Sequence, residues 1–285
     1  MIGIFAAVRW LNEAGLMALY GDAVLAHLLR TQSLSLPRGG WRKIAAPLVL
    51  ITALLWLCLV AAQMAGDTGA MFNPSILTQV ITQTLFGQVF VARLALLILL
   101  CVAVFASWRP ILTALFSGIA LVTISFTSHA AEASPAHFIA IGITADALHL
   151  LTGGFWIGGL ILLAELFARR VDNSVLAGAV GTFSQTGMIA VSLLVLTGML
   201  NAASILLGGA GHDAPLYLLV LGAKLALVLV MIGLALFNQL RLLPRLAAGG
   251  SREQLLRHVR LELGLGFGVV ALAALLTLLP PTLGS

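Results

Sequence analysis

Charged side chains are scarce in this chain. Of its 285 residues only 9% are Asp, Glu, Lys or Arg, and 61% are hydrophobic, whereas a soluble domain carries about 25% charged residues. This composition excludes an ordinary soluble domain. A transmembrane helix needs about 20 apolar residues, and the chain divides into eight such segments. We therefore predict an all-α membrane protein, a single domain of eight transmembrane helices over residues 1–285.

Other signals are also missing. The two cysteines, Cys58 and Cys101, lie in apolar runs and form no CxxC pair, which argues against a disulfide framework or a zinc ribbon. No GxxxxGK[ST] segment occurs, so we expect no direct coupling to ATP. We also expect that the protein is not an enzyme. The N-terminus lacks a basic region before an apolar run, so no cleavable signal peptide is expected.

The eight helices are predicted at about 3–29, 44–64, 86–106, 111–127, 138–167, 183–207, 216–238 and 259–279. The first is the most polar, with Arg9, Asn12, Glu13, Asp22 and His27, so other helices must shield it. Residues 171–182 are expected to form a linker of small residues. Residues 241–260 are expected to form a basic loop.

The basic residues indicate how the helices are oriented. Twelve of the 15 Lys and Arg residues lie in the connections after the first, third, fifth and seventh helices, and none lies in the other connections. The positive-inside rule then places both termini outside, which in a Gram-negative bacterium is the periplasm. Because the net charge of +5 follows this pattern, we attribute it to topology and expect no nucleic-acid partner.

The fifth helix carries a polar stripe. Asp146, His149, Gly153 and Trp156 are spaced 3, 4 and 3 residues apart, so they share one face of the helix. Ionisable groups at membrane depth are costly and normally face a protein interior or a watery cavity. The stripe is therefore a candidate site. The GxxxG pairs Gly154/Gly158 and Gly264/Gly268 suit close helix packing or dimerisation, and we favour packing.

Polar residues from several helices fall at one depth. In the predicted topology the outer half of the membrane contains Arg9, Glu13, Arg93, Asp146, His149, Asn201 and Lys224. The outer connections and helix ends add Met64, Met71, His129, Glu132, His137 and His212. This shared depth predicts a polar chamber that opens to the outside.

Several ordered segments resemble the CopD family of inner-membrane copper-homeostasis proteins. They are the D-x-x-H-x-x-x-x-x-x-W-x-G-G pattern of residues 146–159, Phe183-Ser184, and residues 196–202, 224–227 and 236–246. The strongest likeness covers about 138–285, whereas the first half agrees mainly in helix number and in Ser128-His129-Ala130. The resemblance implies a multi-pass protein of the bacterial plasma membrane. It also implies a role in copper resistance or uptake alongside a periplasmic CopC-type copper-binding protein.

Copper(I) prefers thioether, thiolate and imidazole ligands. We predict that the outer ligands Met64, Met71, His129, His137 and His212 capture the ion and pass it to His149. Asp146 would orient that imidazole or balance its charge. Trp156 would pack or act as a gate beneath the site. The dispersed outer ligands form no dense repeat, so a copper-storing loop is not expected.

Three buried cations leave a second function open. Arg9, Arg93 and Lys224 would repel a cation unless Glu13, Asp146 or a bound anionic group neutralises them. Structural ion pairing is one explanation, and Arg9 and Glu13 are spaced for a local pair. The alternative is a haem- or quinone-binding redox protein with His149 and His129 as axial ligands. A third possible function is a membrane scaffold that only recruits a periplasmic partner. We rank it last, because the buried polar groups would then have no role.

Overall fold

The computed structural model describes residues 2–32, 39–127, 139–169, 171–207, 215–242 and 252–279. These residues form helices and connections, with no strand among them. In chain order the elements are α1 (Ile2–Thr31), α2 (Arg42–Ala65), η1 (Thr68–Phe72), α3 (Pro74–Gln83), α4 (Leu85–Phe105), α5 (Pro110–Ser125), α7 (Ile139–Ala168), α8 (Asn173–Leu207), α9 (Pro215–Phe237), η2 (Asn238–Leu242) and α11 (Arg252–Leu276). The predicted all-α fold is confirmed for this part of the chain.

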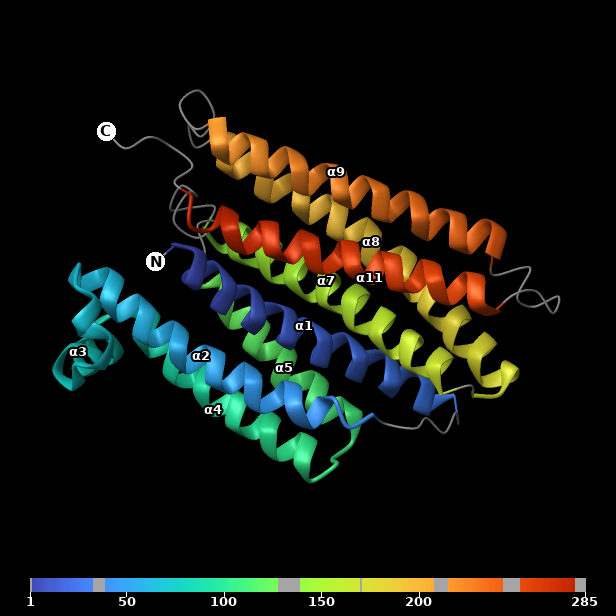
Figure 1. The fold of residues 1–285 in the computed structure, drawn as a ribbon, viewed down its shortest axis with the longest axis horizontal. Coiled ribbons are helices and arrows are strands. Elements are labelled where there is room, and N and C mark those ends of the chain that lie inside the picture. Colours follow the sequence, from blue (N-terminus) through green and yellow to red (C-terminus); the bar gives the residue numbers. More distant parts are fainter. Residues whose placement is uncertain are drawn as a thin grey trace.

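The long helices lie side by side and alternate in direction (Figure 1). α1 begins and α11 ends at the same end of the bundle, beside α3, and we call this the terminal end. The opposite end carries Arg42, Arg169 and Arg252, and we call it the basic end. Each long helix therefore has one terminal and one basic end, which sets the depth of every side chain below.

Six of the described helices are long and apolar enough to cross a membrane: α2, α4, α7, α8, α9 and α11. α5 is apolar but has only 16 residues, and the polar α1 is not among the six. The chain is thus a multi-pass membrane protein. The count of eight spans and the placement of both termini outside stay predictions.

α1 lies inside the bundle. It packs most extensively against α7 and also against α5, α2 and α11. Its Asn12 is fully buried, and Nδ2 of this residue donates to the carbonyl oxygen of Val49 on α2 at 2.8 Å. Because the surrounding helices supply such partners, a polar helix is accommodated without exposing its polar groups to lipid. The prediction that α1 is shielded is confirmed.

Glycines bring α1 and α7 into close contact. A Cβ atom built on Gly158 would lie 2.6 Å from both the carbonyl oxygen of Ala18 and Cα of Gly21, closer than such atoms approach. The Gly154/Gly158 pair therefore serves packing within the chain, as predicted. Gly264 and Gly268 do not: a Cβ on Gly264 would meet nothing within 4 Å, and one on Gly268 would meet only a side chain.

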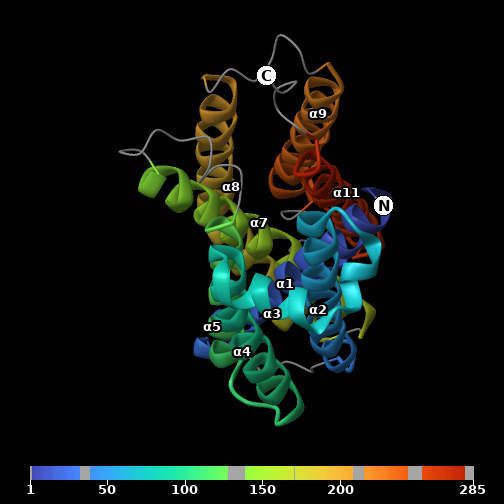
Figure 2. The ribbon, with the colours of Figure 1, turned by 90° about the vertical axis from the view of Figure 1, so that its left-hand side faces the viewer.

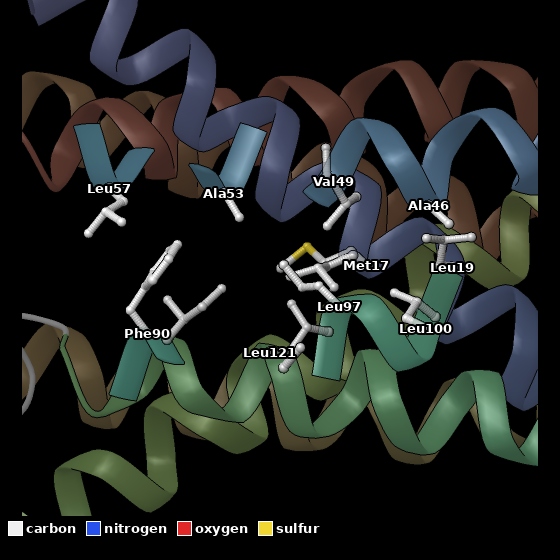
Figure 3. Close-up of a cluster of buried hydrophobic side chains, with 14 of the residues drawn as sticks. Met17, Leu19, Ala46, Val49, Ala53, Leu57, Phe90, Leu97, Leu100 and Leu121 are labelled. Atoms are coloured by element: carbon white, nitrogen blue, oxygen red, sulfur yellow. The ribbon is translucent and has the colours of Figure 1, made fainter. Parts of the chain in front are cut away.

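A hydrophobic cluster fills the space between α1, α2, α4 and α5 (Figure 3). Leu19 of α1 and Leu97 and Leu100 of α4 are fully buried there. Between membrane helices such side chains stabilise the fold through close van der Waals packing, because lipid is as apolar as the protein interior. This half of the bundle therefore holds the polar residues described below in fixed positions.

Two sequence-based boundaries are wrong. The expected linker 171–182 is helical from Asn173, because Leu176, Ala179 and Val180 are buried in the core that α7 and α11 share. The expected basic loop 241–260 is helical from Arg252. Terminal nitrogens of Arg252 donate to the carbonyl oxygens of Leu166, Phe167 and Val171 at 3.0–3.2 Å, and this contact caps the end of α7.

Within the predicted connection 65–85, the structure places the short helices η1 and α3. The side chains of Asp67 and Asn73 accept from the backbone N–H groups of Gly69 and Ser75 at the starts of these helices. Such N-capping stabilises a helix start by about 1 kcal/mol. The connection is therefore an ordered part of the terminal end.

Buried ion pairs join three helices at the basic end. Nη2 of Arg42 on α2 lies 2.5 Å from Oδ1 of Asp22 on α1 and 3.2 Å from Oε2 of Glu165 on α7. A cavity of about 240 Å³ lies beside this pair and is lined in part by Lys43, Ser107 and Thr113. Removing one partner of such a buried pair costs about 3–5 kcal/mol, so this network fixes α1 against α2 and α7.

Candidate functional site

Nine side chains of the terminal half, some buried and some half-buried, lie at one level. Each is six to eleven residues from the terminal end of its helix, which corresponds to about 9–16 Å at 1.5 Å per residue. They are Arg9, Glu13, Trp56, Arg93, Asp146, His149, Thr197, Asn201 and Lys224. The common depth expected from the sequence is thus present in the helix bounds, and contacts divide these residues into two groups.

The first group surrounds Trp56 of α2. Nε of Arg9 lies 2.7 Å from Oε1 of Glu13, which confirms the predicted local pair. Cζ of Arg9 and Cζ of Arg93 lie 4.9 and 5.3 Å from the centre of the Trp56 ring, within the range of cation–π attraction. Two guanidinium groups from α1 and α4 therefore share one indole.

Arg93 is the most deeply buried cation of this group, with 1% of its surface exposed. Its Nε donates to the hydroxyl oxygen of Thr123 on α5 at 2.7 Å. Nη1 and Nη2 are buried and have no hydrogen-bond partner among the described residues. A buried charged donor without a partner is costly, so this guanidinium is the one that most needs an anionic neighbour.

The second group lies between α7 and α8, where Nδ1 of His149 is 3.2 Å from the hydroxyl oxygen of Thr197. The Thr197 hydroxyl donates its own hydrogen to the carbonyl oxygen of Leu193 at 2.7 Å. We therefore assign this hydroxyl as the acceptor and Nδ1 of His149 as the donor, and the ring also hydrogen-bonds to the backbone of Leu194. Nε2 is then left with a lone pair that is available to a metal ion.

The backbone of α8 also limits how this imidazole can lie. A Cβ atom at Gly198 would be 3.1 Å from Cε1 of His149, so the ring rests against the position where a side chain would begin. Nearer the terminal end, Nδ2 of Asn201 is 3.4 Å from Oδ1 of Asp146. The D-x-x-H residues of α7 thus face the threonine and asparagine of α8.

Charge links the two groups. Lys224 of α9 lies within electrostatic range of Asp146 and Glu13, and its own charge acts on His149. Glu13 acts in the same way on Arg93. α8 and α9 stand apart from each other, with α7 and α11 beneath them (Figure 2). Lys224 therefore acts by charge on side chains of α7 and α1. Three cations and two carboxylates share this level of the bundle.

The remaining predicted ligands are distributed differently. Met64, at the end of α2, is 56% exposed, whereas Met71 in η1 packs against the cluster that contains Trp56. His129, His137 and His212 lie outside the described residues, as does Glu132. Within the described ranges no group of three or more His, Cys, Asp or Glu side chains is arranged to hold a metal ion. The roles of these residues stay predictions.

Trp156 is buried among apolar residues of α7, α8 and α11, and its indole N–H donates to the carboxylate of Glu262 on α11. The predicted helix begins at Val259 and puts Glu262 near the membrane surface, so this carboxylate is absent from the predicted site. Thr197 and Trp56 are absent from it as well. Thr197 precedes Asn201 by one helical turn, a spacing that signals its place on the same face; no local pattern identifies Trp56.

Comparison with known proteins identifies the family. Residues 1–138 match the family model "Copper resistance protein D-like, N-terminal domain", and residues 177–276 match "Copper resistance protein D". Copper resistance protein D of Pseudomonas syringae pv. tomato is 30% identical over an alignment of 306 positions that covers 95% of this chain and 97% of the relative. This chain belongs to the copper resistance protein D family. The predicted resemblance is therefore confirmed, and it extends over both halves of the chain.

A further relative of this copper resistance protein D family member is the copper transport protein CutJ of Bacillus subtilis (strain 168). It is 27% identical over 233 positions, which cover 77% of this chain and 41% of the relative. No solved structure matches the chain significantly. The names of both relatives concern copper resistance or transport, and neither names an enzyme.

Proposed function

We propose that this protein transfers copper(I) across the plasma membrane through His149. The observation that carries the proposal is the bond between His149 and Thr197, which directs the Nδ1 hydrogen to α8 and leaves Nε2 free as a ligand. Imidazole nitrogen is a ligand that copper(I) accepts. A partner on the second nitrogen is also the usual way in which proteins orient a metal-binding histidine.

We propose that the transfer is inward, from the periplasmic side. With both termini outside, the terminal end faces the periplasm, and a CopC-type copper-binding protein delivers the ion there. Met64 and Met71 lie at this end, and His129, His137 and His212 belong to the connections predicted beside them. These side chains would pass the ion to His149, with Asp146 and Asn201 alongside. A membrane potential of 100 mV favours inward movement of one positive charge by about 2.3 kcal/mol.

The charges at the level of His149 suit transient binding. The carboxylates of Glu13 and Asp146 attract a copper ion, whereas Arg9, Arg93 and Lys224 oppose it. An ion that is held too tightly does not move on. We infer that this balance lets His149 capture copper without retaining it.

The test is anaerobic copper(I) addition to the detergent-purified protein, with elemental analysis before and after. The wild type is expected to retain copper at His149, and His149→Ala is expected to lose it while its level in the membrane stays unchanged. His27→Ala is a matched control, because His27 lies on α1 near the basic end. Full copper retention by His149→Ala would refute the site.

One observation favours a second function. The buried Nη1 and Nη2 of Arg93 have no partner among the described residues. Such an arginine is expected in a protein that binds a haem propionate or another anion at this position. The visible spectrum of the purified protein separates the two functions. A Soret band with stoichiometric iron would support a redox protein with His149 and His129 as axial ligands, and a colourless protein without iron would support copper transfer.

A further inference from the structure

The cavity at the basic end has no part in the proposed copper path. Its volume is about 240 Å³, and it is lined from α1, α2, α4, α5 and the turn between α4 and α5. Arg42 and Lys43 line it from the first turn of α2, and Pro110 and Thr113 from the first turn of α5. Ser107 lines it from the turn before α5. Polar groups from separate elements therefore converge on one space where these helices begin.

Two tryptophans indicate that the cavity lies at the level of lipid headgroups. Trp41 directly precedes α2, and Trp108 lies in the turn before α5. Tryptophan side chains gather at the interface between membrane and water. Ile44 and Phe105, each next in sequence to a residue of the cavity wall, are exposed apolar side chains. The cavity is thus placed where a headgroup can enter it while the acyl chains stay outside, against the helices.

The surroundings of the cavity carry surplus positive charge. The adjoining ion-pair network contains two arginines and two carboxylates, so its charges cancel. Lys43 and Arg109 have no ion pair among the described residues. Arg109 is the N-cap residue of α5, and its side chain makes no capping bond. The positive end of the α5 dipole therefore adds to the two side-chain charges, and an anion is favoured here.

A buried hydroxyl in the cavity wall lacks a partner. Thr113 is only 6% exposed, and its hydroxyl forms no hydrogen bond within the described part of the chain. In contrast, Thr123 on the same helix donates to the carbonyl oxygen of Ala120 at 2.6 Å. A buried polar group without a partner is costly. An acceptor placed in the cavity would remove this cost.

Ser107 is held in a backbone conformation that serine rarely adopts. Its φ is 54°, and among the described residues it is the one non-glycine residue with a positive φ. Its N–H donates to the carbonyl oxygen of Val104 at 3.2 Å, and that of Trp108 to Ala103 at 2.9 Å. This pair of bonds ends a helix with a left-handed residue that is usually glycine. What serine adds over glycine here is a hydroxyl at the cavity, and such strain often marks a functional position.

We propose that this cavity binds the phosphate group of an anionic phospholipid, with Lys43, Ser107 and Thr113 as its donors. An ammonium group, hydroxyls and a helix N-terminus are ordinary partners of phosphate. The cavity is smaller than the pockets of about 300–1,000 Å³ that enclose whole drug-sized ligands, so it suits a headgroup. In the predicted topology the basic end faces the cytoplasmic leaflet, which is rich in anionic lipids. The inference does not depend on copper transfer.

The test is a titration of the delipidated, full-length protein in detergent with phosphatidylglycerol, with bound lipid counted by native mass spectrometry. The wild type is expected to bind one phosphatidylglycerol tightly and to gain thermal stability from it. Phosphatidylethanolamine, which has no net charge, and inorganic phosphate should do neither at the same concentration. Equal binding of phosphatidylethanolamine would overturn the preference for an anionic lipid. Equal stabilisation by inorganic phosphate would overturn the lipid as the source of the phosphate group.

Two variants remove donors from the cavity. Lys43→Gln should weaken phosphatidylglycerol binding about fivefold, the usual effect of one basic residue at an anionic membrane surface. Thr113→Val keeps the shape of the side chain, and loss of its hydroxyl should weaken binding about two- to tenfold. Arg257→Gln is the control, because it removes one exposed positive charge from α11 near the same end of the bundle. If Arg257→Gln weakens binding as much as Lys43→Gln, general attraction to the basic end explains the effect and the cavity site is wrong.

Ser107→Gly separates lipid binding from stability. Glycine adopts a positive φ without strain, so the thermal unfolding midpoint of the lipid-free variant should rise. Its affinity for phosphatidylglycerol should nevertheless fall about two- to tenfold, because the hydroxyl is lost. A residue that only shapes the turn would change the midpoint and leave the affinity unaltered. Wild-type affinity in Ser107→Gly, Thr113→Val and Lys43→Gln alike would refute the site.

Discussion

Nδ1 of His149 and the hydroxyl oxygen of Thr197 lie 3.2 Å apart and join α7 to α8 at the centre of the polar level. The hydroxyl is itself fixed by its bond to the carbonyl oxygen of Leu193. The pair therefore determines both the orientation of the imidazole and the nitrogen that remains free. Under the proposed function, changes at Thr197 should alter copper binding without removing the ligand.

Thr197→Val is expected to weaken copper(I) binding about 10- to 100-fold, the usual effect of removing a partner that orients a metal ligand. Valine has the shape of threonine but cannot accept the Nδ1 hydrogen. Thr197→Ser keeps the hydroxyl and should bind copper like the wild type. Chelator competition measures both affinities, and equal affinities for the valine and serine variants would show that this bond does not orient His149.

Gly198→Ala should displace the imidazole of His149, because the added methyl group occupies space next to the ring. The added Cβ would lie 3.1 Å from Cε1 of His149, which is tighter than ordinary van der Waals contact, so the imidazole must shift by a few tenths of an ångström. We expect about a tenfold loss of copper affinity without a fall in the thermal unfolding midpoint. Gly187→Ala on the same helix is the control, because its Cβ would meet nothing within 4 Å. If both variants bind copper alike, the contact with Gly198 does not matter.

Gly158→Ala tests the crossing of α1 and α7. Its Cβ would overlap backbone atoms of Ala18 and Gly21, and backbone cannot move aside as a flexible side chain can. Overpacking of this kind costs about 1–3 kcal/mol, so the unfolding midpoint in detergent should fall. Gly233→Ala on α9, whose Cβ would meet nothing within 4 Å, should leave it unchanged or raise it through better helix propensity. A Gly158→Ala variant as stable as the control would contradict the close crossing.

Lys224→Met should tighten copper(I) binding by tenfold or more. The substitution removes a positive charge that acts on His149 and leaves the carboxylates of Asp146 and Glu13 less neutralised, and both changes favour a bound cation in a low-dielectric site. Slower release from vesicles should accompany the tighter binding. Lys43→Met, which removes an exposed lysine at the basic end, is the control. Weaker binding in Lys224→Met would mean that the lysine organises the site instead of opposing the ion.

Hydrophobic runs located the helices well wherever a long apolar segment ended at charged or turn-forming residues, as α2 and α4 do. They failed at residues 173–182 and 252–258, where small or charged residues join a helix because neighbouring helices bury one of its faces. Tertiary packing overrides local propensity in such segments.

For the site, the sequence by itself determined which polar residues share a helix face and a depth, because a regular helix of known rise determines both. It thereby identified the stripe of Asp146, His149 and Trp156 and the local pair of Arg9 and Glu13. Only the tertiary structure decided which helix each face meets. That choice gave His149 its partner Thr197, placed Arg9 and Arg93 on one indole, and buried Glu262 against Trp156. Such pairings depend on how separate helices cross, and the periodicity within a single helix carries no information about its neighbours.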